Sequence, residues 1–328
     1  MMEYRRLGKT GMEVSAVGFG AWAIGSSWGA VSEDDAVSAL NTAADMGVNF
    51  FDTADVYGGG RSETFIAGLL RSCPRQLFAA TKAGRGLNPH TAEMYTPEHI
   101  RSFVLESLRR LGRESIDLLQ LHCPPTQVYY NPVLFAGLDE MVSEGIIRHY
   151  GVSVEKVEEA LKAIEYPNVS TVQIIFNIFR QRPRELFFRE AARRDVGIIV
   201  RVPLASGLLS GKITRDRVFS EDDHRYYNRT GAEFDRGETF AGVDFEKGLE
   251  AVELLRELVP EGMTMAQFAL RWILMFDEVS SVIPGAKRSS QAEENTKAAD
   301  FPPLNDAVMH KIDEIYETYI KDDVHHLW

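Results

Sequence analysis

Eight short apolar runs recur along the chain, and amphipathic segments separate most of them. The runs lack the apolar–polar alternation of half-exposed strands, which is typical of strands covered on both faces. They span residues 15–22, 48–54, 77–84, 116–122, 147–154, 171–177, 197–203 and 279–285. Helical patterns lie at about 33–47, 62–72, 97–112, 132–145, 154–165, 183–195 and 264–276. This order predicts an α/β fold, a parallel (β/α)8 TIM barrel formed by residues 1–328 as a single domain.

Two segments fall outside this repeat. Residues 3–14 have the pattern of an N-terminal β-hairpin that turns around Lys9, Thr10 and Gly11, and such a hairpin could close the bottom of a barrel. Residues 205–244 form a long polar loop after the seventh predicted strand. A loop of this length in a compact domain is usually either functional or disordered.

The bulk composition excludes some classes of function. The formal net charge is −12, which argues against nucleic acid or an anionic membrane as a partner, since both need a cationic face. Cys73 and Cys123 are the only cysteines, and their spacing predicts neither a disulfide framework nor a metal site. No apolar run reaches membrane-spanning length. These features predict a soluble, cytoplasmic protein that acts on a small molecule.

Polar side chains stand at the ends of successive predicted strands. In a parallel barrel the carboxyl ends of the strands meet at one rim, and active sites lie there. Each residue alone has a structural explanation, such as a turn cap, a surface lysine or a core histidine, but their recurrence at one rim favours a site. The residues are Asp52, Lys82, His122, Ser153 and Arg201, with Gln173 inside the sixth strand and Tyr57 on the glycine-rich turn after the second strand.

These residue types suit proton donation to a developing alkoxide. A tyrosine hydroxyl titrates near ~10, and a lysine about 4 Å away is worth on the order of 4 kcal/mol, or roughly three pKa units. We therefore expect Lys82 to bring the pKa of Tyr57 towards neutrality, Asp52 to hold Lys82, and His122 to bind the substrate carbonyl oxygen. The set contains no reductant, so a hydride carrier has to be supplied as a cofactor.

The segments DTADVYG, ATKAG and LLQLHCP carry Asp52, Tyr57, Lys82 and His122, and they resemble the catalytic tetrad of the aldo-keto reductase family. The resemblance extends through the segments GFGAW, GVS, PLASGLLSGK and IPGAKRSSQAEEN. Its C-terminal part is similar to the bacterial branch that also contains the potassium-channel β subunits. It implies an NADP(H)-dependent reductase of aldehydes or ketones, which in reverse would oxidise sugars or polyols, with these four residues as the catalytic tetrad.

The same resemblance implies that NADPH or NADP⁺ lies extended across the strand ends. Ser153 and Gln173 are expected at its carboxamide, and Lys287, with Arg288, at its 2′-phosphate. From the nicotinamide to the adenosine end, the implied cofactor-binding residues are Gly20, Ala21, Trp22, Asp52, Ser153, Gln173, Arg201, Pro203, Leu204, Ser206, Gly207, Lys212, Gly285, Lys287, Gln291, Glu294 and Asn295.

Two positions depart from the family pattern. Val154 follows Ser153 where the family commonly has asparagine, and Arg201 stands where an aromatic side chain usually stacks on the nicotinamide. A guanidinium is planar and can stack. Its charge would disfavour NADP⁺, so we expect Arg201 to shift binding towards NADPH.

Two other functions remain open at the level of the sequence. Lys82 could form a Schiff base in a barrel lyase, or the protein could hold NADP(H) tightly and turn over slowly as a redox sensor, like the channel β subunits. The substrate is expected to contact residues 205–244, Trp28 and the loops at 85–95 and 123–131. The resemblance permits either a monomer or a larger ring.

Overall fold

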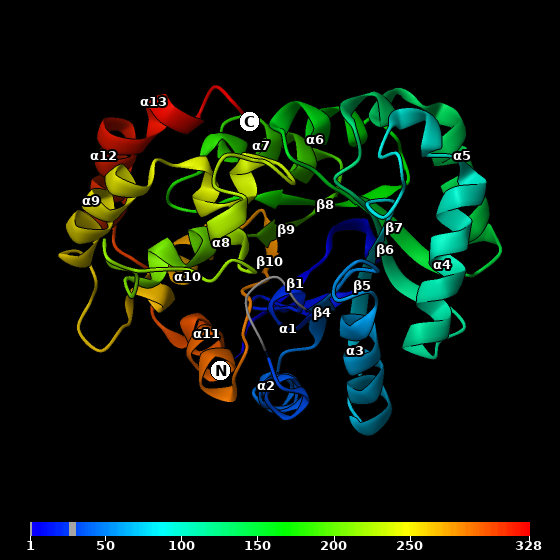
Figure 1. Cartoon of the computed structure of the whole chain (residues 1–328), viewed down its shortest axis with the longest axis horizontal. Coiled ribbons are helices and arrows are strands. Elements are labelled where there is room, and N and C mark those ends of the chain that lie inside the picture. Colours follow the sequence, from blue (N-terminus) through cyan, green and yellow to red (C-terminus); the bar gives the residue numbers. More distant parts are fainter. Residues whose placement is uncertain (1, 26–30) are drawn as a thin grey trace.

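Eight parallel strands form the centre of the molecule in a computed structural model, which describes residues 2–25 and 31–328 (Figure 1). Each strand pairs with its sequence neighbours, and parallel bridges from Val17 to Val282 and from Gly20 to Gly285 join the first strand region to the last. The predicted (β/α)8 barrel is therefore confirmed. The strands are β3 (Phe19–Gly20), β4 (Phe50–Asp52), β5 (Phe78–Ala83), β6 (Ile116–His122), β7 (Ile147–Ser153), β8 (Val169–Ile175), β9 (Gly197–Arg201) and β10 (Val279–Val282).

Helices surround the strands, as Figure 1 shows. The helix that begins at Pro97 illustrates the local signals: the Thr96 hydroxyl accepts a hydrogen bond from the His99 amide, and Gly112 ends the helix in a left-handed conformation. The helices are α1 (Trp22–Gly25), α2 (Glu33–Asp45), α3 (Arg61–Ser72), α4 (Pro97–Leu111), α5 (Pro132–Ser143), α6 (Val157–Ala163), α7 (Phe187–Arg193), α8 (His224–Tyr227), α9 (Phe245–Arg256), α10 (Met265–Ile273), α11 (Ser289–Thr296), α12 (Asp306–Ile315) and α13 (Lys321–Val324).

The predicted first strand, residues 15–22, is wrong over most of its length. Only Phe19–Gly20 is paired as a strand, and Trp22 already begins α1. The run reads as one strand because almost all of its side chains are buried. A Cβ at Gly20 would lie 2.6 Å from the Ile283 carbonyl oxygen, so this close approach of two backbones requires glycine.

The predicted N-terminal hairpin is confirmed. Strand β1 (Tyr4–Arg6) pairs antiparallel with β2 (Glu13–Ser15). Leu7, Met12 and Val14 are buried in one apolar cluster with the barrel residues Phe50, Phe78, Ala80, Leu118, Ile199 and Ile283. The hairpin therefore closes the end of the barrel opposite the strand carboxyl ends.

The long segment after β9 is packed rather than extended into solvent. His224 and Asn228 are fully buried, and the Ser206 hydroxyl donates to the Glu238 carbonyl oxygen (2.9 Å) and accepts from the Phe240 amide (3.1 Å). The segment therefore forms an ordered cover over the strand ends.

The C-terminal residue holds this cover in place. The Trp328 indole N–H donates to Asp235 Oδ1 at 2.8 Å, and its ring lies 3.8 Å from the Arg180 guanidinium carbon. Cβ atoms at Gly237 and Gly242 would collide with the Trp328 ring, so both glycines are needed for this packing. Among the described residues, no helix has the length and apolar character needed to cross a membrane.

The hairpin packing predicts a large loss of stability for Leu7→Ala. Leu7 is fully buried, and removal of a buried leucine side chain costs about 2–5 kcal/mol. Urea unfolding at pH 7 should show this loss, whereas Leu105→Ala on α4, where the side chain is 52% exposed, should stay within about 0.5 kcal/mol of wild type. A loss below about 1 kcal/mol for Leu7→Ala would mean that the hairpin is not part of the cooperative core.

Candidate active site

Four side chains meet at the carboxyl ends of β4, β5 and β6. The Lys82 ammonium donates to Asp52 Oδ2 at 2.6 Å, to the Thr53 carbonyl oxygen at 2.8 Å and to the Tyr57 hydroxyl at 3.3 Å. The rings of Tyr57 and His122 lie edge to face with centroids 5.8 Å apart. The structure therefore brings together Asp52, Tyr57, Lys82 and His122.

The ion pair between Asp52 and Lys82 is almost completely buried, with side chains 3% and 1% exposed. Burial alone would lower the pKa of Lys82, but the charge of Asp52 and the contact with Tyr57 outweigh it and raise this pKa above its usual value. The other oxygen of Asp52 accepts from the amides of Gln120 (3.1 Å) and Gln173 (2.7 Å). Lys82 is therefore held charged and fixed in position.

The expected fall in the pKa of Tyr57 is wrong for this structure. Burial raises the pKa of the Tyr57 hydroxyl to about 12, and the opposing charge of Lys82 is too small to reverse this, partly because Asp52 offsets it. Burial and the charges of Arg85 and Lys82 lower the pKa of His122 well below its usual value. The site therefore holds a protonated tyrosine and a neutral imidazole at neutral pH.

A cavity of about 500 Å³ lies over this rim. Ala21 is fully buried outside the lining, and Lys82 lies beneath Tyr57. The other sixteen residues expected at the cofactor, together with Tyr57 and His122, line the cavity: Gly20, Trp22, Asp52, Ser153, Gln173, Arg201, Pro203, Leu204, Ser206, Gly207, Lys212, Gly285, Lys287, Gln291, Glu294 and Asn295. Arg288 precedes α11 outside the lining, and Trp28 lies outside the described residues.

The lining suits an extended, anionic dinucleotide. The lining contains Asp52, Tyr57 and His122 of the tetrad together with Lys287, which precedes α11. Arg217 and Arg225 also line the cavity; the sequence interpretation missed them, although both are basic residues of the 205–244 segment. Cations at a helix start favour a phosphate.

Some of the expected contacts are already occupied within the protein. Lys212 forms an ion pair with Glu294 at 3.0 Å, and the Ser206 hydroxyl is bonded to the cover. The Ser153 hydroxyl donates to the Gln173 side-chain oxygen at 3.3 Å, so these two residues are joined to each other in the cavity wall.

Arg201 lies among other ionisable side chains. Its guanidinium lies 2.9 Å from Glu155 Oε2 and 3.7 Å from Glu238 Oε1. Arg85 approaches the same two carboxyl groups, at 4.0 Å and 3.4 Å. The sequence analysis did not identify Glu155 and Glu238 as site residues, because no regular spacing relates them to Arg201. Glu238 reaches the rim only in the folded cover. The charge that was expected to disfavour NADP⁺ is therefore partly offset by Glu238, which is ionised, whereas burial raises the pKa of Glu155 to about 8.

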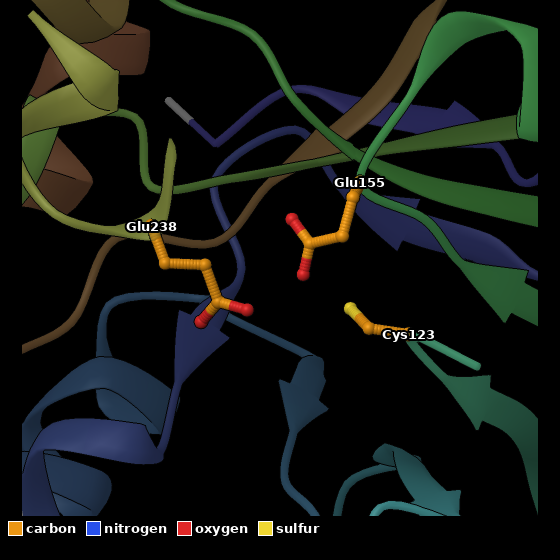
Figure 2. A group of neighbouring side chains, drawn as sticks. All are labelled: Cys123, Glu155 and Glu238. Carbon is orange, nitrogen blue, oxygen red and sulfur yellow. The ribbon is translucent and has the colours of Figure 1, made fainter. Parts of the chain in front are cut away.

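Figure 2 shows that Cys123, Glu155 and Glu238 point toward one another. One ligand atom from each lies within 4.8 Å of the others, a separation that would suit a metal ion. The Arg201 guanidinium contacts both the Cys123 sulfur (3.5 Å) and Glu155, and thus already supplies positive charge there. We therefore interpret the three residues as part of a charged group centred on the arginines.

Comparisons with known proteins define the family. The model of the Aldo/keto reductase family matches residues 16–317, so the chain belongs to this family of nicotinamide-dependent oxidoreductases. It is 30% identical over 332 residues to a probable voltage-gated potassium channel subunit beta of Arabidopsis thaliana, covering 97% of both chains. It is also 30% identical over 325 residues to the NADH-specific methylglyoxal reductase of Escherichia coli, covering 92% of this chain and 94% of the relative.

A solved structure agrees with this assignment. The glycerol dehydrogenase AKR11B4 from Gluconobacter oxydans superimposes with a TM-score of 0.79 at 28% identity, covering 97% of this chain and 96% of that one. The chain is thus an aldo-keto reductase with the family's TIM barrel, and its relatives include both enzymes and channel subunits, as the sequence resemblance indicated.

Replacement of Asp52 by asparagine should destabilise the protein, because it leaves the Lys82 ammonium buried without a counter-charge. Breaking such a pair costs about 3–5 kcal/mol. Because the pKa of Lys82 is raised in the folded state, the stabilisation is fully present below pH 10.5 and is lost as pH rises through the folded value. Urea unfolding at pH 7 measures the loss.

Asp45→Asn, which breaks an exposed pair with Arg75, is the control and should change stability by less than about 1 kcal/mol. Equal effects of the two variants would contradict the role of burial.

Asp55 predicts a loss of stability with rising pH as well, but in the acidic to neutral range. Burial and the charge of Glu63 raise its pKa from 3.8 to about 7. The folded state therefore binds the proton more tightly, so Asp55 costs stability progressively as pH rises from about 4 to about 7. Urea unfolding measures the difference in free energy of unfolding between Asp55→Asn and wild type. This difference should favour the variant more at pH 8 than at pH 4, by on the order of 2–4 kcal/mol. The same gain at both pH values, or an equal pH effect in the exposed Asp222→Asn, would contradict this prediction.

Proposed function

We propose that the chain, working as one catalytic unit, reduces an aldehyde or ketone with NADPH and can oxidise the corresponding alcohol with NADP⁺. The observation that carries this proposal is the contact of Lys82 with both Asp52 and Tyr57 at the floor of the cavity. The cofactor, when bound, supplies the hydride. All other steps belong to side chains of this chain.

Tyr57 is the proton donor in this proposal. With a pKa of about 12 its hydroxyl stays protonated throughout the neutral range, which suits donation to an alkoxide that forms as the carbonyl is reduced. Lys82 stabilises the tyrosinate that remains, and Asp52 keeps Lys82 aimed at the hydroxyl oxygen. In the oxidative direction the same tyrosine has to lose its proton first, so alcohol oxidation gains more from high pH than reduction does.

His122 orients the substrate. Its Nδ1 is buried and has no hydrogen-bond partner among residues 2–25 and 31–328, and the low pKa of the ring keeps the imidazole neutral. A neutral imidazole can donate one hydrogen bond to the carbonyl oxygen without competing with Tyr57 for the proton. The carbonyl would thus be held between two donors, the imidazole and the phenol.

Basic residues of the cavity lining favour NADPH over NADH. Arg217 and Arg225 line the cavity together with Lys287, the residue at which the resemblance places the 2′-phosphate. Ser153 and Gln173 would receive the carboxamide, and Gly207 the pyrophosphate. The NADH-specific relative shows that this choice varies among similar chains, so it has to be measured for this one.

A slow redox sensor is the second candidate, and the similarity to a channel subunit favours it over a lyase. A Schiff base at Lys82 requires a deprotonated, accessible amine. Lys82 is instead buried, donates three hydrogen bonds and has a raised pKa. Slow single-turnover hydride transfer together with tight retention of the cofactor would support the sensor.

Titration of the protein with NADPH and NADH, followed by tryptophan fluorescence, tests the proposal. We expect tight binding of NADPH and at least tenfold weaker binding of NADH. Tyr57→Phe should bind NADPH with unchanged affinity and lose at least about 100-fold in the rate of aldehyde reduction, because general acid catalysis contributes about 10²–10⁴-fold.

The exposed Tyr226→Phe, in the cover, is the matched control and should retain full activity. If neither nucleotide binds, the protein has no hydride carrier and the reductase proposal fails. Full activity in Tyr57→Phe would remove Tyr57 as the acid while leaving the reductase intact.

A further inference from the structure

Four ionisable side chains beside the tetrad form a group of which only Arg201 was expected to contact the cofactor. Arg85 follows β5, Glu155 follows β7, Arg201 ends β9, and Glu238 belongs to the cover after β9. We refer to these four residues as the charged quartet. Their convergence from four separate segments indicates a built feature, since each segment has to be positioned independently.

Arginine and glutamate side chains alternate in the quartet, and Glu238 carries most of its negative charge at neutral pH because burial raises the pKa of Glu155 to about 8. Each guanidinium lies within 4.0 Å of both carboxyl groups: Arg201 at 2.9 Å and 3.7 Å, and Arg85 at 4.0 Å and 3.4 Å. The four side chains are only 10–21% exposed. Charges this well buried are costly unless their hydrogen-bonding capacity is satisfied.

Some of that capacity is unused. Glu238 Oε1 and Arg201 Nε are buried and have no hydrogen-bond partner among the described residues. Both residues line the same cavity as Tyr57 and His122. An unsatisfied buried polar atom costs about 1–3 kcal/mol, which a ligand that pairs with it would recover.

The quartet also lies close enough to act on the reacting groups. Arg85 and Arg201 lower the pKa of His122, and Glu238 raises that of Tyr57. A carbonyl held between Tyr57 and His122 therefore places its neighbouring substituents within the field of the quartet.

A hydroxyl group suits the unused atoms better than an ionic or an apolar group does. A hydroxyl can donate one hydrogen bond and accept another. It can therefore donate to the carboxylate oxygen of Glu238 and accept from the Nε–H of Arg201 at the same time. A substrate carboxylate would face Glu238, whose pKa the two arginines hold at about 2 against the effect of burial, so this group stays ionised. An alkyl group would leave both polar atoms unpaired.

We propose that Glu238 and Arg201 select substrates that carry a hydroxyl group beside the reacting carbonyl, with Glu238 accepting a hydrogen bond from that hydroxyl and Arg201 donating one to its oxygen. The assignment rests on the proposed reductase function and deepens it. It makes Glu238 and Arg201 specificity-determining residues and names hydroxylated aldehydes and ketones as the preferred class.

Three two-carbon aldehydes test the proposal, because they differ only in the group beside the carbonyl. Glycolaldehyde carries a hydroxyl, acetaldehyde a hydrogen and glyoxylate a carboxylate. NADPH oxidation by the full-length protein gives kcat/KM for each, expressed per free, unhydrated carbonyl. We expect wild type to prefer glycolaldehyde to either of the others by at least tenfold.

Glu238→Gln keeps the shape of the side chain and removes its charge. The ratio of kcat/KM for glycolaldehyde to that for acetaldehyde should fall at least tenfold, mainly through a higher KM for glycolaldehyde. Arg201→Lys keeps the charge but removes the Nε–H, and it should lower the same ratio. Glu233→Gln, which alters an exposed carboxylate of the same cover, is the control and should leave the ratio unchanged.

Three results would overturn the assignment: equal use of glycolaldehyde and acetaldehyde by wild type, a preference for glyoxylate, or an unchanged ratio in Glu238→Gln. A merely structural role of Glu238 would lower activity on both neutral aldehydes together and leave their ratio unchanged. If none of the three aldehydes leads to oxidation of NADPH, the proposed function itself is overturned. Turnover of all three without selectivity would instead overturn only the role of Glu238 and Arg201.

Discussion

The active site depends on one buried ion pair, Asp52 with Lys82. Each ion pays a desolvation cost of several kcal/mol when it leaves water, so the pair is retained for what it positions rather than for stability alone. One oxygen of Asp52 fixes Lys82, which in turn reaches the Tyr57 hydroxyl. The other oxygen accepts from Gln173, whose own oxygen accepts from Ser153. A single carboxylate therefore organises both the proton donor and the pocket expected to hold the nicotinamide amide.

This arrangement follows from the strand register. Lys82 on β5 pairs with Gln120 on β6, and Ser153 on β7 pairs with Gln173 on β8. A shift of one residue in any of these strands would turn its polar side chain away from the rim. The backbone is also strained where the rim is built: Cys123 and Val202, directly after β6 and β9, have φ values of 46° and 51°. Such conformations cost on the order of 1–3 kcal/mol each and persist where the surrounding fold imposes them.

The barrel and the floor of the site could be predicted because both are encoded locally. Apolar runs without alternation mark covered strands, and a polar residue that ends such a run has to lie at the common rim, as Asp52, Lys82 and His122 do. The pKa of Tyr57 could not be predicted, because the distance to Lys82 is only one factor and the extent of burial is a property of the whole fold. The predicted strand at 15–22 failed for a related reason, since burial of its side chains does not show whether its backbone is paired.

Glu238 could not be predicted from the polar side chains at the ends of the strands. It lies in a polar segment without helical or strand periodicity, and it reaches the rim only because that segment is packed down by Ser206, Arg180 and Trp328.

The position of Glu238 at the rim explains how the chain can place Arg201 where the family usually has an aromatic ring. A lone guanidinium beside a nicotinamide would repel the oxidised cofactor, and the ionised Glu238, 3.7 Å from Arg201, weakens that field. The cover and the arginine therefore depend on each other, because the folded cover places a carboxylate beside the arginine that ends β9.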